Sequence, residues 1–265
     1  MRTSTDNGAT WSKARVLQPC GEFGNQLIRT REGYLVITHD SRQVSLVISR
    51  DGGQTWTYND VAHRTSDFRP GGQGFRYPGI HAPLVQLADG RLMTISRNDS
   101  PEDQAKFGFK TPISYSSDWG KTWTYAASDF PAISSVQRQV LMRLREGPLL
   151  LCSFTDQRRD WNQRKGLTFQ AADGSQFTGY GLFAAISFDE GQTWPMRKVI
   201  TPGGPERKAL SIDRSEFTIS ATLAESGGYL AACQTRDGRL QLITSKNHYV
   251  FNLAWLKQLP PPPSK

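Results

Sequence analysis

Short runs of alternating apolar and polar residues recur along this chain, each run ending at an acidic residue followed by glycine. The pattern of strand, acidic-Gly turn and strand occurs four times, at residues 26–38, 82–96, 139–153 and 230–244. Each copy predicts a β-hairpin, because such turns join strands whose side chains alternate between two environments. The second strands are more continuously apolar, which is typical of strands buried on both faces.

A second repeat, Ser-x-Asp-x-Gly-x-Thr-Trp, lies between the hairpins. It occurs at Ser4–Trp11, Ser49–Trp56, Ser116–Trp123 and Ser187–Trp194. We expect the Asp side chain to accept backbone N–H groups within its own turn, while Gly supplies a backbone conformation that other residues avoid. Each Trp should then be largely buried beside its turn, where its large ring fixes the hairpin.

Together the two repeats predict an all-β chain, a β-propeller in which each blade has strands a, b, c and d and the box joins c to d. The predicted blades cover residues 19–62, 63–131, 132–203 and 204–258. The last blade has no box and ends in a strand c at 248–256, whereas residues 1–18 carry a box and a strand d without a, b or c. The chain could close as four blades through this N-terminal strand, but we favour an incomplete propeller over 1–258, followed by a Pro-rich tail at 259–265.

Composition adds limits to this architecture. The net charge of +8 is spread over loops. It indicates either an acidic glycan as partner or only a charged, soluble surface. Nucleic acid is a less favoured partner, because basic and aromatic residues are not interleaved along the chain. No apolar run is long enough to span a membrane, and no signal-peptide core is evident. The sequence predicts neither a cofactor nor a metal site, since the box carboxylates belong to their turns and no His/Cys spacing fits zinc. Three scattered cysteines leave the redox compartment open.

The topology assigns the a–b turns and the boxes to one face, and the starts of strand a with the ends of strand b to the other. The second face gathers Arg, His, Tyr and carboxylate side chains, the types needed for proton transfer on an anionic sugar. We expect the candidate site there. Its candidate catalytic residues are Tyr229, His81 and Arg97; its candidate substrate-binding residues are Arg76, Tyr77, Arg138, Asp99, His39 and His248.

The boxes and hairpins resemble those of the sialidase superfamily, in particular sialidase-like proteins with BNR/Asp-box repeats. Three further stretches carry the resemblance, at residues 77–83, 137–149 and 247–256. The resemblance implies a six-bladed propeller, of which about two N-terminal blades lie outside this chain. It also implies a secreted or periplasmic glycoside hydrolase that acts on terminal, anionic sugars of a glycan or oligosaccharide.

Sialidases use an arginine triad for the substrate carboxylate, a Tyr nucleophile assisted by Glu, and an Asp acid/base, and they are an exception to the two-carboxylate scheme. The resemblance implies that Tyr229 is the nucleophile and that Arg97 points inward at the end of a strand b. The assisting Glu is replaced by His81 or Ala82. The Asp acid/base and the first triad Arg would lie in the N-terminal blades that this chain lacks.

Three functions remain open from the sequence. The first is a sialidase-like glycosidase, inactive in this form if the missing blades are essential. The second is a lyase on uronate-rich polysaccharide, with His81 or His248 as base, Tyr77 or Tyr229 assisting, and Arg76 neutralising the uronate. The third is a non-catalytic glycan- or protein-binding propeller. The insertion at 157–180 is either a lid or a disordered excursion, and the sequence names neither the sugar nor the linkage.

Overall fold

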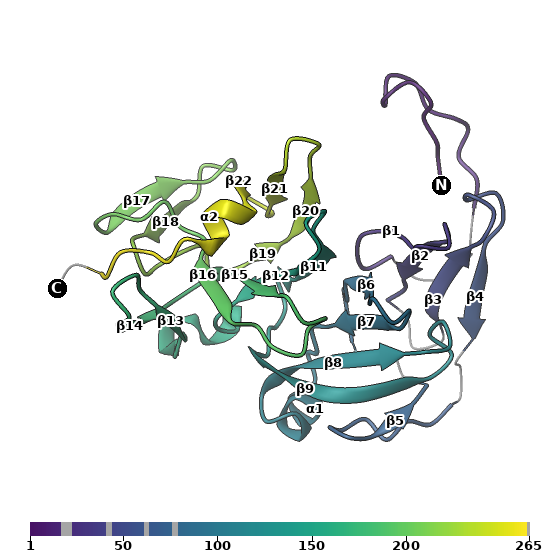
Figure 1. The fold of residues 1–265 in the computed structure, drawn as a ribbon, viewed down its shortest axis with the longest axis horizontal. Coiled ribbons are helices and arrows are strands. Elements are labelled where there is room, and N and C mark those ends of the chain that lie inside the picture. Colours follow the sequence, from purple (N-terminus) through teal and green to yellow (C-terminus); the bar gives the residue numbers. More distant parts are fainter. Residues whose placement is uncertain (17–22, 41–43, 61–63, 76–78, 264–265) are drawn as a thin grey trace.

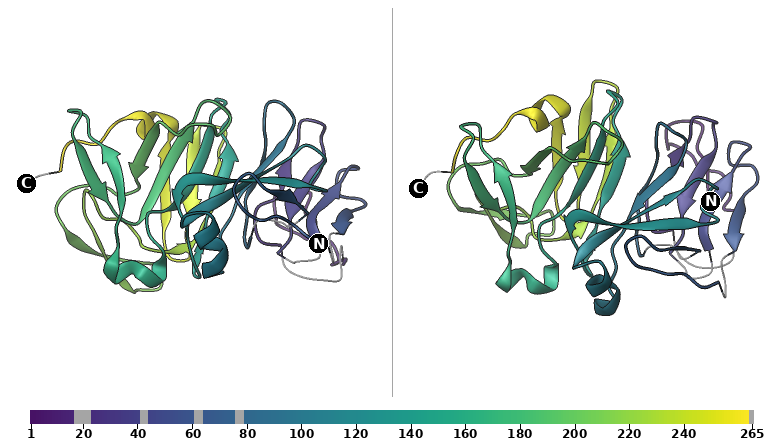
Figure 2. Two further views of the ribbon diagram at one scale, coloured as in Figure 1. Left: turned by 90° about the horizontal axis from the view of Figure 1, so that it is seen from below. Right: turned by 60° about the horizontal axis from the view of Figure 1, so that its bottom comes forward.

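The computed structural model describes residues 1–16, 23–40, 44–60, 64–75 and 79–263. It is built almost entirely of antiparallel sheets, and four of them follow one another along the chain as blades (Figure 1). Blades 1 and 2 lie at one end of an elongated molecule and blades 3 and 4 at the other, with the termini far apart (Figure 2). The predicted propeller of about four blades is therefore confirmed.

Blades 1 and 2 each follow the expected order of strands from the inside outward. Blade 1 is the sheet β1 (Ile28–Arg29), β2 (Leu35–Thr38), β3 (Val44–Ser49) and β4 (Thr57–Asp60). Blade 2 is the sheet β6 (Leu84–Gln86), β7 (Leu92–Ile95), β8 (Lys110–Ser116) and β9 (Trp123–Pro131), with β5 (Gln73–Gly74) added outside β9. Helix α1 (Pro101–Lys106) connects β7 to β8.

Blade 3 also has four strands, whereas blade 4 has three. Blade 3 is β11 (Val140–Arg143), β12 (Leu149–Phe154), β15 (Leu182–Ser187) and β16 (Met196–Val199). Blade 4 is β20 (Ala231–Gln234), β21 (Arg239–Ile243) and β22 (His248–Asn252). Helix α2 (Leu253–Lys257) follows β22 directly, so the predicted strand at 248–256 ends early. Asn252 caps this helix by accepting a hydrogen bond from the backbone N–H of Trp255.

The box turns have the predicted chemistry. In the second box the Asp51 carboxylate accepts the backbone N–H of Thr55 at 2.8 Å, and the Ser49 hydroxyl accepts that of Gly53 at 2.8 Å. Gly53 has φ +92°, a conformation that side chains other than glycine rarely adopt. The same bonds recur in the other boxes. Each box is therefore complete within eight residues of chain.

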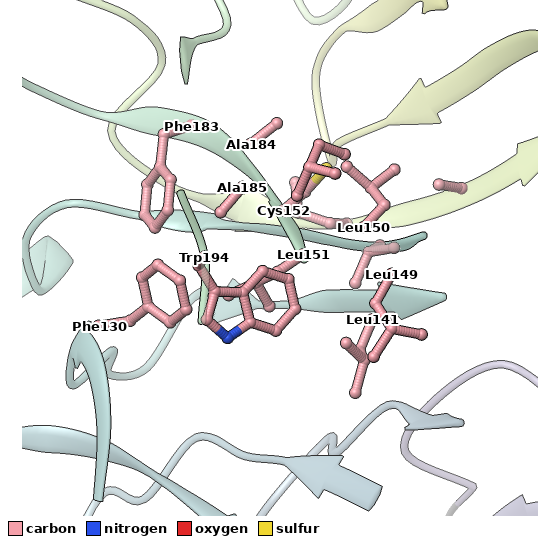
Figure 3. Packing of buried hydrophobic residues seen from close by; sticks show 14 of the residues in the cluster. Phe130, Leu141, Leu149, Leu150, Leu151, Cys152, Phe183, Ala184, Ala185 and Trp194 are labelled. Carbon is pink, nitrogen blue, oxygen red and sulfur yellow. The ribbon is translucent and has the colours of Figure 1, made fainter. Parts of the chain in front are cut away.

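The box tryptophans do not all share one environment. Trp123 and Trp194 are buried, and Trp194 packs edge-to-face on Phe130 of blade 2 with ring centroids 5.5 Å apart (Figure 3). Trp56 is half-buried, whereas Trp11 is 58% exposed. The prediction of four buried rings is right for two of them and wrong for Trp11. Its box turn forms, but residues 1–16 contain no strand and bring no blade edge against the ring.

The insertion at 157–180 is ordered. It contains a 3-10 helix, η1 (Arg158–Gln163), and a hairpin formed by β13 (Leu167–Gln170) and β14 (Gln176–Gly179). Phe169 of this hairpin is buried in the main core. A further hairpin, β17 (Arg207–Leu210) and β18 (Glu216–Ile219), lies before blade 4 and was not expected from the sequence.

A short parallel pair joins blades 3 and 4 near their inner strands. Strand β10 (Gln137–Arg138) pairs with β19 (Gly228–Tyr229), with Arg138 opposite Tyr229. Residues far apart in sequence thus meet at the starts of two inner strands. This pairing fixes the backbone on which the candidate site is built.

Candidate functional site

The candidate site lies where the inner strands of blades 2, 3 and 4 begin and where the second strand of blade 1 ends. Asp40 follows β2 of blade 1, His81 precedes β6 of blade 2, Arg138 belongs to β10 before blade 3, and Tyr229 belongs to β19 before blade 4. Contacts link these four residues in one continuous group. Each of the four blades therefore contributes one side chain.

Asp40 and His81 form the most buried contact of the group. The Asp40 Oδ2 atom lies 2.6 Å from Nδ1 of His81, and the two side chains are only 7% and 15% exposed. Oδ1 of the same carboxylate accepts the backbone N–H of His81 at 2.9 Å. His81 also has φ +55°, which is unusual for a residue with a side chain. The carboxylate therefore holds the backbone of His81 by a hydrogen bond and lies against Nδ1 of its ring.

Tyr229 packs against the ring of His81. The two ring centroids are 5.2 Å apart and the ring planes meet at 66°. Tyr229 is 39% exposed, and its backbone N–H donates a 3.0 Å hydrogen bond to the Ser245 hydroxyl. A phenol that is partly open to solvent and lies beside an oriented imidazole can take part in proton transfer or nucleophilic attack.

Arg138 lies against the same phenol. Its guanidinium carbon is 5.6 Å from the centre of the Tyr229 ring, and its Nε donates to the carbonyl of Leu230 at 3.0 Å. Burial lowers the pKa of Arg138, while the nearby Tyr229 and Asp40 act in the opposite direction. Within the described part of the chain, no carboxylate pairs with this guanidinium. A half-buried arginine with free terminal nitrogens is suited to a ligand carboxylate.

Arg97, by contrast, is engaged by the protein. It is 6% exposed, its Nη1 donates to the carbonyl of Gln137 at 3.1 Å, and its Nη2 donates to Asp99 at 2.9 Å. These bonds join the end of β7 to the start of blade 3. Arg97 lies just after the end of β7, as predicted. Its guanidinium, however, binds Asp99 and the backbone carbonyl of Gln137.

The remaining predicted site residues are dispersed. His39 is fully buried and packs edge-to-face on Phe23 at 5.6 Å, next to Asp40 in sequence. His248 is exposed at the start of β22, where its Nε2 lies 2.8 Å from the side-chain oxygen of Gln241. Within the described part of the chain, no contact joins His248 to the four-residue group. Arg76 and Tyr77 lie outside the described residues.

Sequence reasoning missed two residues that hold the group together. Asn25 donates through Nδ2 to the carbonyl of His81 at 2.8 Å and to that of Gln139 at 3.2 Å, so it bridges the starts of blades 2 and 3. Gln137 is fully buried and binds backbone groups of Ser134, Asp156, Arg158 and Ser226. Both precede an inner strand, which was the only signal in the sequence.

A buried carboxylate supports the segment before Tyr229. Glu225 is 4% exposed and accepts hydrogen bonds from the Tyr249 hydroxyl at 2.8 Å, the Asn247 amide at 2.9 Å and the Thr244 hydroxyl at 3.0 Å. Burial, reinforced by the negative charge of Glu225, raises the pKa of Tyr249. The network ties the β21–β22 turn to residues just before β19.

A cavity of about 500 Å³ lies next to this group, along the inner strands. It is lined by β1, β6 and β11 and by the residues around them: Asn25 to Arg29, Arg31, Pro83 to Ala88 and Leu141 to Arg143. Among its lining residues, Asn25 contacts His81 of the candidate site. The cavity is therefore bounded by the inner strands of blades 1, 2 and 3, and Asn25 connects it to the four-residue group.

The repeated blades and the box turns define a β-propeller of the sialidase type. A family model described as a BNR repeat-like domain matches residues 1–242, so the chain belongs to that family. Within the described residues, no helix is long and apolar enough to cross a membrane.

Individual relatives agree with this assignment. A sialidase of Micromonospora viridifaciens is 25% identical over 96% of this chain, which spans about a third (35%) of that relative's length. Among solved structures, a variant of the NanB sialidase of Streptococcus pneumoniae matches 93% of this chain with a TM-score of 0.56 and 16% identity, and 32% of that protein is covered. A protein of unknown function from Dyadobacter fermentans matches 94% of this chain with a TM-score of 0.52 and 17% identity, over 61% of its own length.

Proposed function

We propose that this chain provides the catalytic face of a sialidase-like glycoside hydrolase that acts on terminal anionic sugars of glycans. The observation that carries the proposal is the contact of Tyr229 with both His81 and Arg138, because it joins a phenol, an oriented base and an unpaired guanidinium. The family and the sialidase relatives support the same class of substrate. A secreted or periplasmic location remains a prediction from the family.

Each residue has a separate role in this proposal. Arg138 binds the sugar carboxylate through its terminal nitrogens, which orients the ring over Tyr229. Tyr229 attacks the anomeric carbon as the glycosidic C–O bond breaks and the aglycone oxygen leaves, and His81 accepts the phenolic proton through Nε2 while Asp40 stabilises the resulting imidazolium. Water then displaces Tyr229 from the covalent intermediate. The acid that protonates the leaving oxygen is not among these four residues.

The experiment compares two tyrosine variants on a fluorogenic sialic acid glycoside. Tyr229→Phe removes the nucleophilic oxygen and should lower kcat/KM by about 10² or more. Tyr58→Phe is the matched control, because Tyr58 is exposed on β4, the outermost strand of blade 1. Equal activity of the two variants would refute the role of Tyr229. Binding of the glycoside by the unaltered chain without any turnover would instead favour a glycan-binding module.

A lyase on uronate-rich glycan is the second candidate, and the Asp40–His81 contact favours it. A histidine held through Nδ1 by a buried carboxylate is suited to abstract a proton next to a uronate carboxylate. Elimination would yield an unsaturated uronide that absorbs in the ultraviolet, whereas hydrolysis yields a free sugar. Product analysis with oligouronate and with sialoside therefore separates the two reactions.

A further inference from the structure

A basic loop at residues 157–166 stands directly beside the candidate site. Gln137, which precedes Arg138, accepts the backbone N–H of Arg158 at 3.1 Å through its side-chain oxygen. The side-chain nitrogen of Gln137 donates to the carbonyls of Asp156 at 2.8 Å and Ser226 at 3.1 Å. One buried side chain thus ties the start of the basic loop to both segments that carry Arg138 and Tyr229.

The basic loop is held in one conformation at its other end too. Asp156 is 8% exposed, and its carboxylate accepts hydrogen bonds from the backbone N–H groups of Lys165 at 2.6 Å and Gly166 at 3.0 Å. Arg164 lies between two rings, 5.1 Å from the centre of Trp161 and 4.9 Å from that of Tyr180. A loop fixed in this way can present its charges without a large loss of entropy on binding.

Arg158 is the residue of the loop that faces the site. The side chain of Arg158 lies close against Gly227. A β-carbon added at Gly227 would be 3.1 Å from Cδ of Arg158, so any larger residue there would push the Arg158 side chain aside. Gly227 comes immediately before β19, which carries Tyr229. The aliphatic part of Arg158 therefore rests on the backbone that positions the phenol.

The loop carries an excess of positive charge at this place. Four of its side chains are basic and exposed (Arg158, Arg159, Arg164 and Lys165), and one, Asp160, is acidic. Asp160 lies 3.9 Å from Arg159, which also donates to Gln104 at 3.0 Å. In the described part of the chain Arg158 has no carboxylate partner, as Arg138 has none. Two unpaired guanidinium groups thus stand on elements that flank Tyr229.

We infer that Arg158 binds a second acidic group of the glycan, on the sugar next to the terminal one, so that the preferred substrate carries carboxylates or sulfates on consecutive sugars. This inference rests on the proposed function, in which Arg138 takes the carboxylate of the terminal sugar. The backbone of Arg158 is held by Gln137 and its aliphatic stem lies against Gly227, so its guanidinium is presented near one place, where it can make a charge-assisted contact.

The test measures the affinities for an α-linked sialic acid dimer and for the monomer by calorimetry at two salt concentrations. Arg158→Gln should reduce the preference for dimer over monomer by about tenfold, the scale of one lost hydrogen bond to a charged group. The matched control is Arg236→Gln, because Arg236 is exposed on the a–b turn of blade 4, at the opposite end of its strands. This control should leave the preference unchanged.

Separate outcomes address the two proposals. If Arg138→Gln abolishes binding of both ligands while Arg158→Gln leaves the preference intact, the proposed function stands and the inference about Arg158 is wrong. Two results would show that the loop attracts any polyanion non-specifically and would overturn the inference. The first is an equal loss of the preference for dimer in the Arg158 and Arg236 variants. The second is a loss of affinity for a DNA duplex in the Arg158 variant as large as its loss for the sialic acid dimer. If the unaltered chain binds neither sugar, both proposals fail.

Discussion

At the scale of single residues, the site depends on how Asp40 holds His81. One carboxylate oxygen accepts the backbone N–H of His81, and the other lies 2.6 Å from Nδ1 of its ring, so one side chain contacts both parts of the residue. Tyr229 and Arg138 then complete the group from two other blades. In the proposed mechanism, Asp40 acts by positioning His81 and does not itself contact the substrate.

Asp40→Asn tests this positioning role. The amide keeps the size of the side chain but not the charge that stabilises the imidazolium, so we expect turnover to fall at least about tenfold while KM changes little. Steady-state kinetics on the fluorogenic glycoside would measure both constants. Asp67→Asn is a suitable control, since Asp67 pairs with Arg69 at an exposed position. A proportional rise of KM with unchanged kcat would argue against the role given to Asp40.

At the scale of elements, the box turns stabilise the blades through ionised carboxylates. Hydrogen bonds from the side chain and the backbone of Thr55 lower the pKa of Asp51 from 3.8 to about 2, and those from Thr10 do the same for Asp6. The pKa values of Asp118 and Asp189 are lowered as well. The hydrogen bond from the Thr193 hydroxyl is the main cause for Asp189. For Asp118, burial acts to raise the pKa, but the hydrogen bonds to its carboxylate outweigh this effect. The folded chain therefore keeps these groups ionised at pH values where the unfolded chain protonates them.

The sign of the pH effect follows directly. The stabilisation is fully present above the unfolded pKa near 3.8 and is lost as the pH falls through the folded pKa near 2. We expect the free energy of unfolding, measured with urea, to stay level from neutral pH to about pH 5 and to fall below pH 4. Combined Asp→Asn changes at positions 51, 118 and 189 should lower stability at neutral pH and flatten that fall. An unaltered slope in this variant would show that other groups dominate.

Two tryptophans of the same repeat should differ sharply in their effect on stability. Trp123→Ala removes a ring that is 1% exposed and should lower the free energy of unfolding by about 3–5 kcal/mol. Trp11→Ala removes a ring that is 58% exposed and should change it by no more than about 0.5 kcal/mol. Chemical denaturation of both variants makes the comparison. Similar losses would mean that Trp11 is packed in solution as Trp123 is.

At the scale of the whole molecule, the blades differ in how well their faces are covered. Strands β3, β12 and β15 are buried at every position, whereas β21 and β22 alternate between covered and open positions. Ile243 and Val250 are 49% and 51% exposed on blade 4. An outer sheet face with apolar residues is a surface on which a further blade or a second copy can pack.

We therefore expect this chain to self-associate through blade 4. Sedimentation velocity should show a species that grows with protein concentration, and Ile243→Lys combined with Val250→Lys should shift it towards monomer. Leu210→Lys is the control, because Leu210 is equally apolar and 68% exposed but lies on a separate hairpin. A chain that stays monomeric at every concentration would contradict this expectation.

Much of the fold could be predicted from the sequence because its signals are local. The hydrogen bonds of a box join Asp51 to Thr55 and Ser49 to Gly53, so eight residues suffice to determine the turn. The acidic-Gly hairpins are local in the same sense, and their order along the chain led directly to the blades. The first box shows the limit: its turn forms, but the burial of Trp11 depends on neighbours that the turn does not supply.

The composition of the site was decided by tertiary structure. The sequence placed His81, Arg138 and Tyr229 on one face, but it could not show that Asp40 reaches His81 or that Arg97 is bound by Asp99 and Gln137. These contacts depend on the distances between inner strands and on the parallel pairing of β10 with β19. Such geometry arises only when separate blades pack together, because no local pattern of residues encodes the spacing between two sheets.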